Sequence, residues 1–426
     1  MRDRTLFALA VSEGAAETAS MAQPSQTRCC IAGGGPAGMM LGFLLARAGV
    51  EVMVLERHAD FLRDFRGDTI HPSTLELMFE LGLLEEFLKR PHQELRELAG
   101  QVGEETIPIG DFSHLPTHCR FIALMPQWDF LNFLVEHGRR YRTFQVKMQA
   151  EVTELIEENG AIRGVRARTP DGVIEIRADL TVGADGRHSV VRERAGLQVR
   201  DIGAPMDVLW MRLSRKAGDP GQTLGRAQSG RILVLIDRED YWQVAFVIPK
   251  GAAEEWKKKG LPALREELAR TAPFLRDRVE ELRDWKDISL LTVAVDRLVR
   301  WHRPGLLCIG DAAHAMSPIG GVGINLAIQD AVAAANILAP VLSRGAPDDE
   351  HLHVVQRRRA FPTRATQWLQ VVIQNKVIRK VLQTNRPIRV PWVMKLLKHW
   401  PVLRRIPARI VGVGFRPEHI KSAEQV

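Results

Sequence analysis

The chain has 426 residues, about three times the size of a typical single domain, so we expect two or more structural units. Hydrophobic residues make up 45% of it and charged residues 26%, which is ordinary for a soluble globular protein. The four cysteines show no metal-ligand spacing and are too few for a disulfide scaffold. This favours a protein without a metal site, in a reducing, cytoplasmic setting.

The formal net charge of +8 is unevenly distributed along the chain. Residues 351–426 contain 16 Lys and Arg against two acids, Glu418 and Glu424, whereas the rest contains 43 basic and 49 acidic residues. A mildly acidic body with a basic tail argues against a nucleic-acid-binding protein, so we expect no nucleic-acid partner.

The N-terminal residues are predicted to lie outside the fold. A short apolar run, Thr5–Val11, is closely followed by Glu13, which makes a poor secretory signal. We expect residues 1–26 to be a disordered leader, with Met21 as an alternative start. One uncharged stretch of membrane-span length, 29–46, contains a Gly-Pro pair that would break a spanning helix, so it predicts a strand, a turn and a helix.

The first motif is a glycine-rich turn within residues 28–56. A short apolar strand leads into Gly33-x-Gly35-x-x-Gly38, an apolar helix follows, and a second strand ends at Glu56. Such a βαβ unit binds a dinucleotide, because the glycines allow a tight turn, close approach of the pyrophosphate and close helix packing. Glu56 would accept hydrogen bonds from ribose hydroxyls and repel a 2′-phosphate, which favours FAD or NAD over NADP in this turn.

The remaining chain alternates between β-rich and helical segments. Residues 165–183 and 208–248 predict short strands, residues 261–284 predict helix, and a long helix is expected to start near Ile324. We therefore predict an α/β protein with a discontinuous Rossmann-like domain, an inserted β-sheet (α+β) substrate domain and a helical tail. The predicted boundaries are 27–95, 125–200 and 285–360 for the first domain, 96–124 and 201–284 for the second, and 361–426 for the basic C-terminal region.

Two further motifs place carboxylates after strands. GADGRHSVVR, residues 183–192, combines a tight Asp-Gly turn with a helix start, although any α/β protein can contain such a turn. GDAAH, residues 310–314, puts Asp311 where ribitol hydroxyls can be held. PIGGVGIN, residues 318–325, would let the backbone approach an isoalloxazine ring and direct the positive end of the following helix at it.

In order and spacing, the three motifs resemble those of the class A FAD-dependent monooxygenases, the para-hydroxybenzoate hydroxylase family, from about Arg28 to Ala339. The resemblance implies that the Rossmann-like domain binds FAD through Gly33, Gly35, Ala37, Gly38, Glu56, Arg57, Arg66, Gln127, Asp185, Gly310, Asp311, Gly323, Ile324 and Asn325. Arg66 would reach the flavin or the pyrophosphate, and Gln127 the ribitol-phosphate region. Pro318 would place its backbone near the reacting flavin edge, which makes it the candidate catalytic position.

The resemblance also implies a reaction. NADPH or NADH would reduce FAD, O₂ would add to give a C4a-hydroperoxyflavin, and an oxygen atom would pass to a hydrophobic aromatic or quinone-like substrate. The chain contains no second Gly-x-Gly-x-x-Gly turn, which disfavours a reductase with two dinucleotide domains. There are three rival interpretations: a reductase or epoxidase acting on an isoprenoid-type substrate, a flavin halogenase, and a membrane-docked flavoprotein without hydroxylation. The halogenase signature Trp-x-Trp-x-Ile-Pro is not met, because residues 241–249 contain only one tryptophan.

Candidate substrate-pocket residues come from the inserted sheet and one loop. Trp210 and Arg212 share a strand face, and Gln243 lies on the face of a second strand. Arg212 and Gln243 are of interest because polar groups on a buried face need partners. His71 is either a base, a lid residue or a loop cap, and His314 is interpreted as a structural histidine.

The basic tail allows two interpretations. Over residues 368–415, basic and apolar side chains alternate at helical spacing. They could form two helices that cover the flavin domain with solvated Lys and Arg faces. They could also attach the protein peripherally to anionic lipid at the inner face of a membrane, and here the chain is similar to ubiquinone-pathway hydroxylases. The oligomeric state stays open between monomer and dimer.

Overall fold

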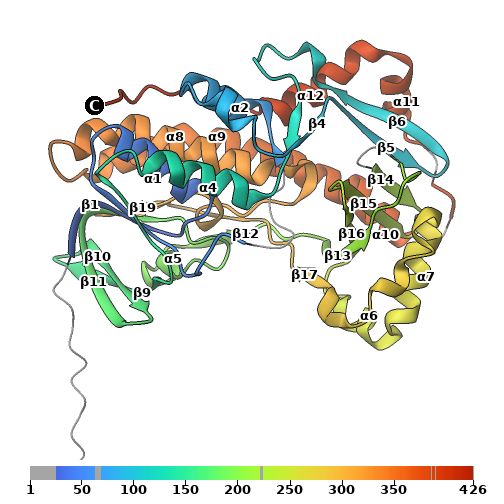
Figure 1. Cartoon of the computed structure of the whole chain (residues 1–426), viewed down its shortest axis with the longest axis horizontal. Coiled ribbons are helices and arrows are strands. Elements are labelled where there is room, and N and C mark those ends of the chain that lie inside the picture. Colours follow the sequence, from blue (N-terminus) through green and yellow to red (C-terminus); the bar gives the residue numbers. More distant parts are fainter. Residues whose placement is uncertain (1–24, 63–68, 221–223, 385, 389, 426) are drawn as a thin grey trace, which may run out of the picture.

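The computed structural model describes residues 25–62, 69–220, 224–384, 386–388 and 390–425 (Figure 1). Arg66 and almost all of the predicted leader lie outside these residues. The first strand begins at Ser25, two residues inside the predicted leader, because Ser25 already pairs with Ile176 of a neighbouring strand.

The larger sheet has a parallel centre. Five strands lie in the order β20-β11-β1-β2-β8: β1 (Ser25–Ala32), β2 (Val52–Leu55), β8 (Phe144–Lys147), β11 (Gly172–Gly183) and β20 (Leu306–Cys308). Antiparallel strands β9 (Glu151–Glu158), β10 (Ala161–Thr169) and β19 (His302–Arg303) extend it. Because β1, β11 and β20 are parallel neighbours in register, their carboxyl ends meet at one edge, and the three predicted motifs start there.

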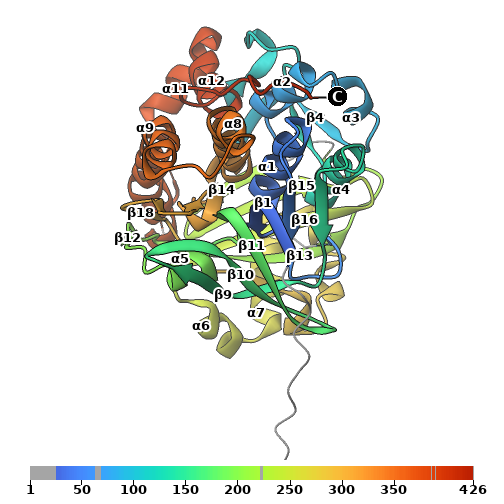
Figure 2. The same cartoon turned by 90° about the vertical axis from the view of Figure 1, so that its left-hand side faces the viewer.

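Four helices lie together over this sheet (Figures 1 and 2). They are α1 (Pro36–Arg47), α4 (Gln127–Gly138), α8 (Val322–Leu342) and α9 (Asp349–Ile373), with α1 between α4 and α8 and α9 against α8. The stretch Ile319–Leu342 is long and apolar enough to cross a membrane, but 67% of its apolar window is buried inside the protein. Its place in the core accounts for its composition.

The second sheet has seven strands in the order β17-β13-β16-β15-β14-β5-β6. They are β5 (Glu97–Val102), β6 (Glu105–Asp111), β13 (Met206–Ser214), β14 (Leu224–Gln228), β15 (Arg231–Asp237), β16 (Tyr241–Pro249) and β17 (Ser289–Leu291). Helices α6 (Ala253–Lys259) and α7 (Leu261–Thr271) cover one face, where Leu209, Met211 and Leu213 alternate inward.

The predicted fold class, α/β with an inserted sheet and a helical C-terminal region, is confirmed. The exact domain boundaries stay a prediction, and β17 carries the second sheet beyond residue 284, where the substrate domain was expected to end. The helix predicted over residues 261–284 stops at Thr271, because Pro273 cannot continue it and the residue before a proline is disfavoured in helical conformation.

Shorter elements connect these parts. β3 (Thr69–Ile70), β7 (Ile122–Leu124) and β4 (Gln93–Leu95) form a small sheet, and β12 (Val199–Asp201) pairs with β18 (Asp296–Leu298). The short helices are α2 (Pro72–Glu80), α3 (Leu84–Phe87) and α5 (Val190–Arg194). Single 3₁₀ turns lie at Phe112–His114, Pro273–Leu275, Val279–Glu281, Trp285–Asp287, Gly310–Ala312, Ile319–Gly321 and Pro401–Arg404.

The C-terminal region contacts both sheets or their helices. α9 continues through a π-helical turn, Gln374–Ile378, into α10 (Arg379–Gln383). α11 (Trp392–His399) and α12 (Arg405–Gly412) pack on β6 of the second sheet. α12 also reaches the predicted flavin domain, because the carbonyl of Val411 accepts a hydrogen bond from His71. The last residues then return to the larger sheet's helices, where Asn336 of α8 donates a 2.8 Å hydrogen bond to the carbonyl of His419.

A buried ionic cluster ties this last segment to α8 and α9. Asp330 accepts hydrogen bonds from Arg359 Nε at 2.8 Å and from the backbone of Gly310 at 3.1 Å, and it pairs with His314 at 2.5 Å. Arg359 also contacts Glu418 at 3.3 Å. Burial alone would raise the pKa of Asp330, but His314 and Arg359 hold it below its usual range. His314 is thus part of a structural network, consistent with the preferred interpretation.

Replacing Asp330 by Asn should lower the free energy of unfolding by about 3–5 kcal/mol, because one half of a buried ion pair is removed and Arg359 loses its charged partner there. The measurement is urea unfolding of the full chain. As a control, Glu254→Gln removes the exposed pair with Lys257 and should change stability little. Equal losses in both variants would contradict the assignment.

All four cysteines, Cys29, Cys30, Cys119 and Cys308, are free and buried. Burial raises the pKa of Cys30 to about 12 and also raises the pKa of the other three. Among the described residues, no group of three or more His, Cys, Asp or Glu could hold a metal ion.

Candidate functional site

The glycine turn between β1 and α1 has the geometry that its spacing predicts. Gly33 has φ +107°, and a Cβ there would collide with the carbonyl of Ala184. A Cβ on Gly38 would collide with the carbonyl of Gly33, whereas a Cβ on Gly35 would meet nothing within 4 Å. The first and third glycines therefore serve close packing, and the second leaves open space in front of the start of α1.

The carboxylate of Glu56 closes this turn from the end of β2. It is buried, and it accepts 3.0 Å hydrogen bonds from the backbone N–H groups of Gly34 and His58. The neighbouring Arg57 is exposed, and its side chain donates to the ring of His58 at 2.9 Å. Glu56 thus lies where a ribose would meet the turn, while Arg57 points to the surface.

The second and third motifs meet through an ion pair. Arg187 Nε lies 3.1 Å from Asp311 Oδ2, which joins the turn after β11 to the turn after β20. Gly310 has φ +58°, and a Cβ there would come within 3.1 Å of Ala37 in α1 and Ala327 in α8. All three motifs are therefore in contact at one edge of the sheet.

Asp185 is held mainly by the backbone of its own turn. Its Oδ2 accepts a 3.1 Å hydrogen bond from the N–H of Val191, and Ser189 donates to the same carboxylate. Burial nonetheless raises the pKa of Asp185 above its usual range. Its Oδ1 and Arg187 Nη1 are buried atoms with no hydrogen-bond partner among the described residues. One acceptor and one donor at this edge of the sheet are therefore available to a ligand.

The loop into α8 is shaped by left-handed glycines. Gly320 and Gly321 have φ +76° and +62°, and a Cβ on Gly321 would strike the hydroxyl of Thr69. Asn325 Oδ1 accepts 2.8 Å hydrogen bonds from His71 N and Thr74 Oγ1. The side chain of Asn325 therefore joins α8 to α2.

The backbone of Gly323 and Ile324 forms the first turn of α8. Gln127 is the first residue of α4 and is partly buried. Pro318 precedes the 3₁₀ turn Ile319–Gly321. Whether these positions contact the cofactor stays a prediction, as it does for the other predicted cofactor residues.

His71 lies at the start of α2, but its side chain does not cap that helix. The ring is fully buried and donates from Nδ1 to the carbonyl of Val411 in α12 at 2.8 Å, while Nε2 has no partner among the described residues. Burial lowers the pKa of His71 to about 4, against the opposing effect of the bond to Val411. The ring is therefore neutral near pH 7, with Nε2 able to accept a hydrogen bond.

One face of the second sheet turns toward the third motif. Val208, Ala245 and Val247 are buried on this face, and Trp210 and Ile319 pack against them. The predicted strand faces of β13 and β16 therefore form one apolar wall beside Pro318.

Two predicted pocket residues behave differently from Trp210. Arg212 was a candidate pocket residue, with the direction of its strand face left open. Its side chain is exposed and its guanidinium carbon lies 3.8 Å from the ring centroid of Tyr241. Gln243 is buried and accepts a 3.1 Å hydrogen bond from Arg238 Nε. Trp210 packs against the same apolar cluster as Ile319 of the third motif.

Several residues of this site were missed from the sequence. Gln367 and Gln370 in α9 bind the backbone within the third motif, at Ala315, Ser317 and Ile319. Asp330 accepts a hydrogen bond from Gly310 of the same motif and another from Arg359. Uncharged glutamines at i and i+3 within a basic helix are a weak signal that could have drawn attention to the pair.

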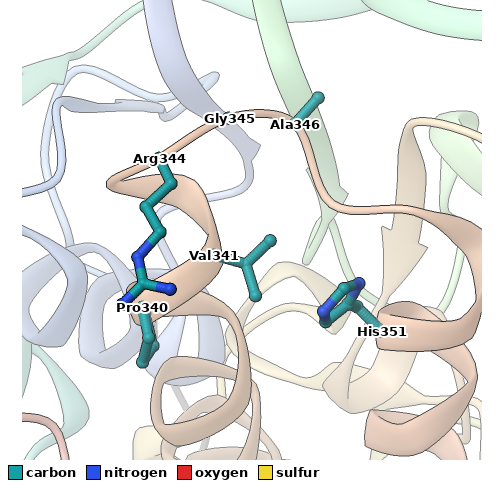
Figure 3. Close-up of a pocket in the computed structure, with 6 residues that line it drawn as sticks. All are labelled: Pro340, Val341, Arg344, Gly345, Ala346 and His351. Carbon is teal, nitrogen blue, oxygen red and sulfur yellow. The ribbon is translucent and has the colours of Figure 1, made fainter.

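A surface hollow of about 350 Å³ lies between the end of α8 and the start of α9 (Figure 3). Its lining residues are Pro340, Val341, Arg344, Gly345, Ala346 and His351. It lies at the opposite end of α8 from the glycine motifs and contains no predicted site residue, so we do not assign it to the site.

Comparison with known proteins agrees with this geometry. The FAD-binding domain family matches residues 26–369. The chain belongs to this family. Among its relatives, 6-methylpretetramide 4-monooxygenase of Streptomyces rimosus is 34% identical over 391 residues, which cover 91% of this chain and 93% of that protein. Dialkyldecalin synthase of Streptomyces rugosporus is 29% identical over 354 residues, covering 79% and 71%.

A solved structure supports the fold. The p-nitrophenol 4-monooxygenase of Pseudomonas putida DLL-E4 aligns with a TM-score of 0.73 at 20% identity, covering 90% of this chain and 97% of that one. The resemblance to class A FAD-dependent monooxygenases is confirmed, and the protein is an oxidoreductase that uses FAD, a reduced nicotinamide and O₂.

The described residues fit an FAD. The open space at Gly35 faces the start of α1, where the first N–H groups of a helix have no partner within it. The carboxylates of Glu56 and Asp311 stand on either side, and the leftover polar atoms of Asp185 and Arg187 lie at the same edge.

Two glycine substitutions should separate cofactor binding from folding. Gly35→Ala adds a methyl group to open space, so it should keep the thermal midpoint of the apoprotein but weaken FAD binding, because the pyrophosphate must approach there. Gly38→Ala should lower the midpoint itself, because its methyl group collides with the Gly33 carbonyl. Thermal unfolding without FAD and FAD titration by fluorescence give the two quantities. Unchanged FAD affinity in Gly35→Ala would contradict the assignment.

The buried His71 predicts a pH dependence of stability. In the unfolded chain the histidine titrates near its usual pKa of about 6.5, so between about pH 6.5 and pH 4 the unfolded state binds more protons and stability falls as the pH falls. His71→Asn, which can still donate to Val411, should flatten this fall in urea unfolding between pH 7 and pH 5. An unchanged pH slope in the variant would refute the placement.

Proposed function

We propose that the protein hydroxylates an aromatic substrate related to 6-methylpretetramide, at a site between the glycine motifs and the apolar wall of the second sheet. The single observation that carries this proposal is the contact of three glycine–carboxylate turns at one sheet edge, directly beside that wall. The relative that is 34% identical over 91% of the chain supports the substrate class.

We further propose which residues hold FAD. The backbone of Gly33, Gly35, Ala37 and Gly38 would receive the pyrophosphate, Glu56 the adenosine ribose, Gln127 and Asp311 the ribitol chain, and the backbone of Gly323, Ile324 and Asn325 the flavin edge. A bound FAD would supply the redox chemistry: acceptance of a hydride from NADPH or NADH and activation of O₂, with one oxygen atom entering the substrate and the other leaving as water. Arg66 remains a candidate outside the described residues.

The protein's own residues then position the substrate and exclude water. Val208, Trp210, Ala245 and Val247 form an apolar wall that would take the ring and keep water from the reacting atoms. The backbone at Pro318 would bound the opposite side. His71 is neutral and buried, and its Nε2 is available as a hydrogen-bond acceptor.

The test uses the full chain reconstituted with FAD. It is supplied with NADPH or NADH, ¹⁸O₂ and either 6-methylpretetramide or simple phenols. We expect the aromatic substrate to stimulate nicotinamide oxidation and one ¹⁸O atom to appear in the product. A chain that takes up no FAD, or a product whose new oxygen comes from water, would overturn the proposal.

A second candidate function has a specific observation in its favour. One relative, 29% identical over 79% of this chain, is named a dialkyldecalin synthase and not a monooxygenase. A flavoprotein without hydroxylation was one of the alternatives left by the sequence. If the FAD-loaded protein converted a substrate to product in the absence of O₂ and of NADPH or NADH, this result would favour the second function over hydroxylation.

We also propose that the tail contacts the cytoplasmic face of an anionic membrane. Four large apolar side chains, each at least 59% exposed, lie on and between α11 and α12, and we call this set the tail patch: Trp392, Trp400, Val402 and Ile406. Exposed basic residues Lys395, Arg405 and Arg409 lie among them. Tryptophan beside Lys and Arg suits the boundary between lipid headgroups and acyl chains.

The tail patch predicts salt-sensitive binding to vesicles. The full chain should sediment with phosphatidylcholine vesicles that contain phosphatidylserine, but not with phosphatidylcholine alone, and Trp392→Ser with Trp400→Ser should abolish this. The matched control is Trp368→Ser in α9, since Trp368 is 68% exposed but lies outside the tail patch. Two results would refute the membrane contact. One is an equal fraction of sedimented protein with and without phosphatidylserine, and the other is an equal loss of sedimentation in the Trp368→Ser control.

A further inference from the structure

The loop before α8 is held by one face of α9. Gln367, Gln370 and Gln374 follow each other at spacings of three and four residues, which places them on the same helix face. All three are at least 97% buried. Buried amides carry several hydrogen-bonding groups that need partners. Gln367 and Gln370 find theirs on the backbone of this loop, whereas Nε2 of Gln374 has no hydrogen-bond partner among the described residues.

Gln370 forms hydrogen bonds with the backbone on both sides of Pro318. Its Nε2 donates to the carbonyls of Ser317 at 2.9 Å and Ile319 at 3.0 Å, and its Oε1 accepts from the N–H of Ser317 at 3.2 Å. One side chain therefore satisfies three backbone groups around a proline, which has no N–H of its own. Ile319 in turn packs against the apolar wall that includes Trp210.

Gln367 makes a comparable set of bonds one turn earlier. Its Nε2 donates to the carbonyls of Asp296 at 2.7 Å and Ala315 at 3.0 Å, and its Oε1 accepts from Arg297 at 3.0 Å. It therefore fixes the base of the loop, three residues before Pro318. The two glutamines lie in the same helix, are buried to a similar extent and make the same number of hydrogen bonds. They differ in the part of the loop to which they bind.

We infer that Gln370 is a positioning residue that sets the place of the Pro318 backbone between flavin and substrate wall. This inference rests on the proposed function, which supplies the position of FAD relative to Pro318. Without the amide, three buried backbone groups lose their partners, so the loop must shift to find others. A shift of about 1 Å at a reacting centre can cost about 100-fold in rate.

The test compares Gln370→Met with Gln367→Met in the full chain. Methionine keeps the length and burial of glutamine and removes the hydrogen bonds. Both variants should lower the thermal midpoint of the apoprotein by a similar amount. Only Gln370→Met should shift the visible absorption band of bound FAD and raise severalfold the fraction of NADPH or NADH electrons released as H₂O₂.

A further variant covers the case in which Gln370→Met does not fold. Gln370→Glu keeps the shape, but its carboxylate cannot donate to Ser317 and Ile319, whereas the protonated acid can donate once. The bound flavin spectrum of this variant should therefore depend on pH and approach that of the wild type as the pH is lowered.

Two outcomes would overturn the inference. One is an identical effect of Gln370→Met and Gln367→Met on the flavin band, and the other is a pH-independent spectrum in Gln370→Glu. Both readouts need only FAD binding. A protein that binds FAD but hydroxylates nothing would therefore refute the proposed function and still test the role of Gln370.

Discussion

Contact between backbones at glycine positions is the constraint on which the rest of the site depends. Gly33 lies against the carbonyl of Ala184, and Gly38 against that of Gly33. Gly310 has φ +58°, and a Cβ there would come within 3.1 Å of the side chains of Ala37 and Ala327. A side chain at any of these points would separate the carboxyl ends of β1, β11 and β20. The parallel sheet brings those ends together, and glycine lets the turns beyond them touch.

Support for this edge comes from helices far along the chain. Asp330 in α8 holds Gly310 and His314, and Arg359 in α9 connects Asp330 to Glu418 near the C-terminus. A charge cluster of this kind is costly to bury unless each member is paired, and here the pairing is shared by three separate segments. The C-terminal region is therefore part of the framework of the site, in addition to its exposed tail patch.

Local patterns made much of the site predictable. The glycine turn and Glu56 could be assigned because the strand, turn and helix that position them are consecutive in sequence. The exposure of Arg212 could not be predicted in this way. The alternation of side chains along a strand shows which residues share a face, but not where that face reaches solvent. The roles of Gln370 and Asp330 were also hidden, because each contact joins residues on different elements whose packing no local pattern specifies.

The buried thiols have a consequence for chemical durability. An enzyme in which O₂ reacts with a reduced cofactor releases some peroxide whenever reoxidation of the cofactor is not coupled to hydroxylation of the substrate. Peroxide oxidises the thiolate form of cysteine and not the thiol. Since burial raises the pKa of Cys30 to about 12 and removes all four sulfurs from the surface, almost none is ionised near neutral pH. The protein should therefore resist inactivation by its own by-product at these positions.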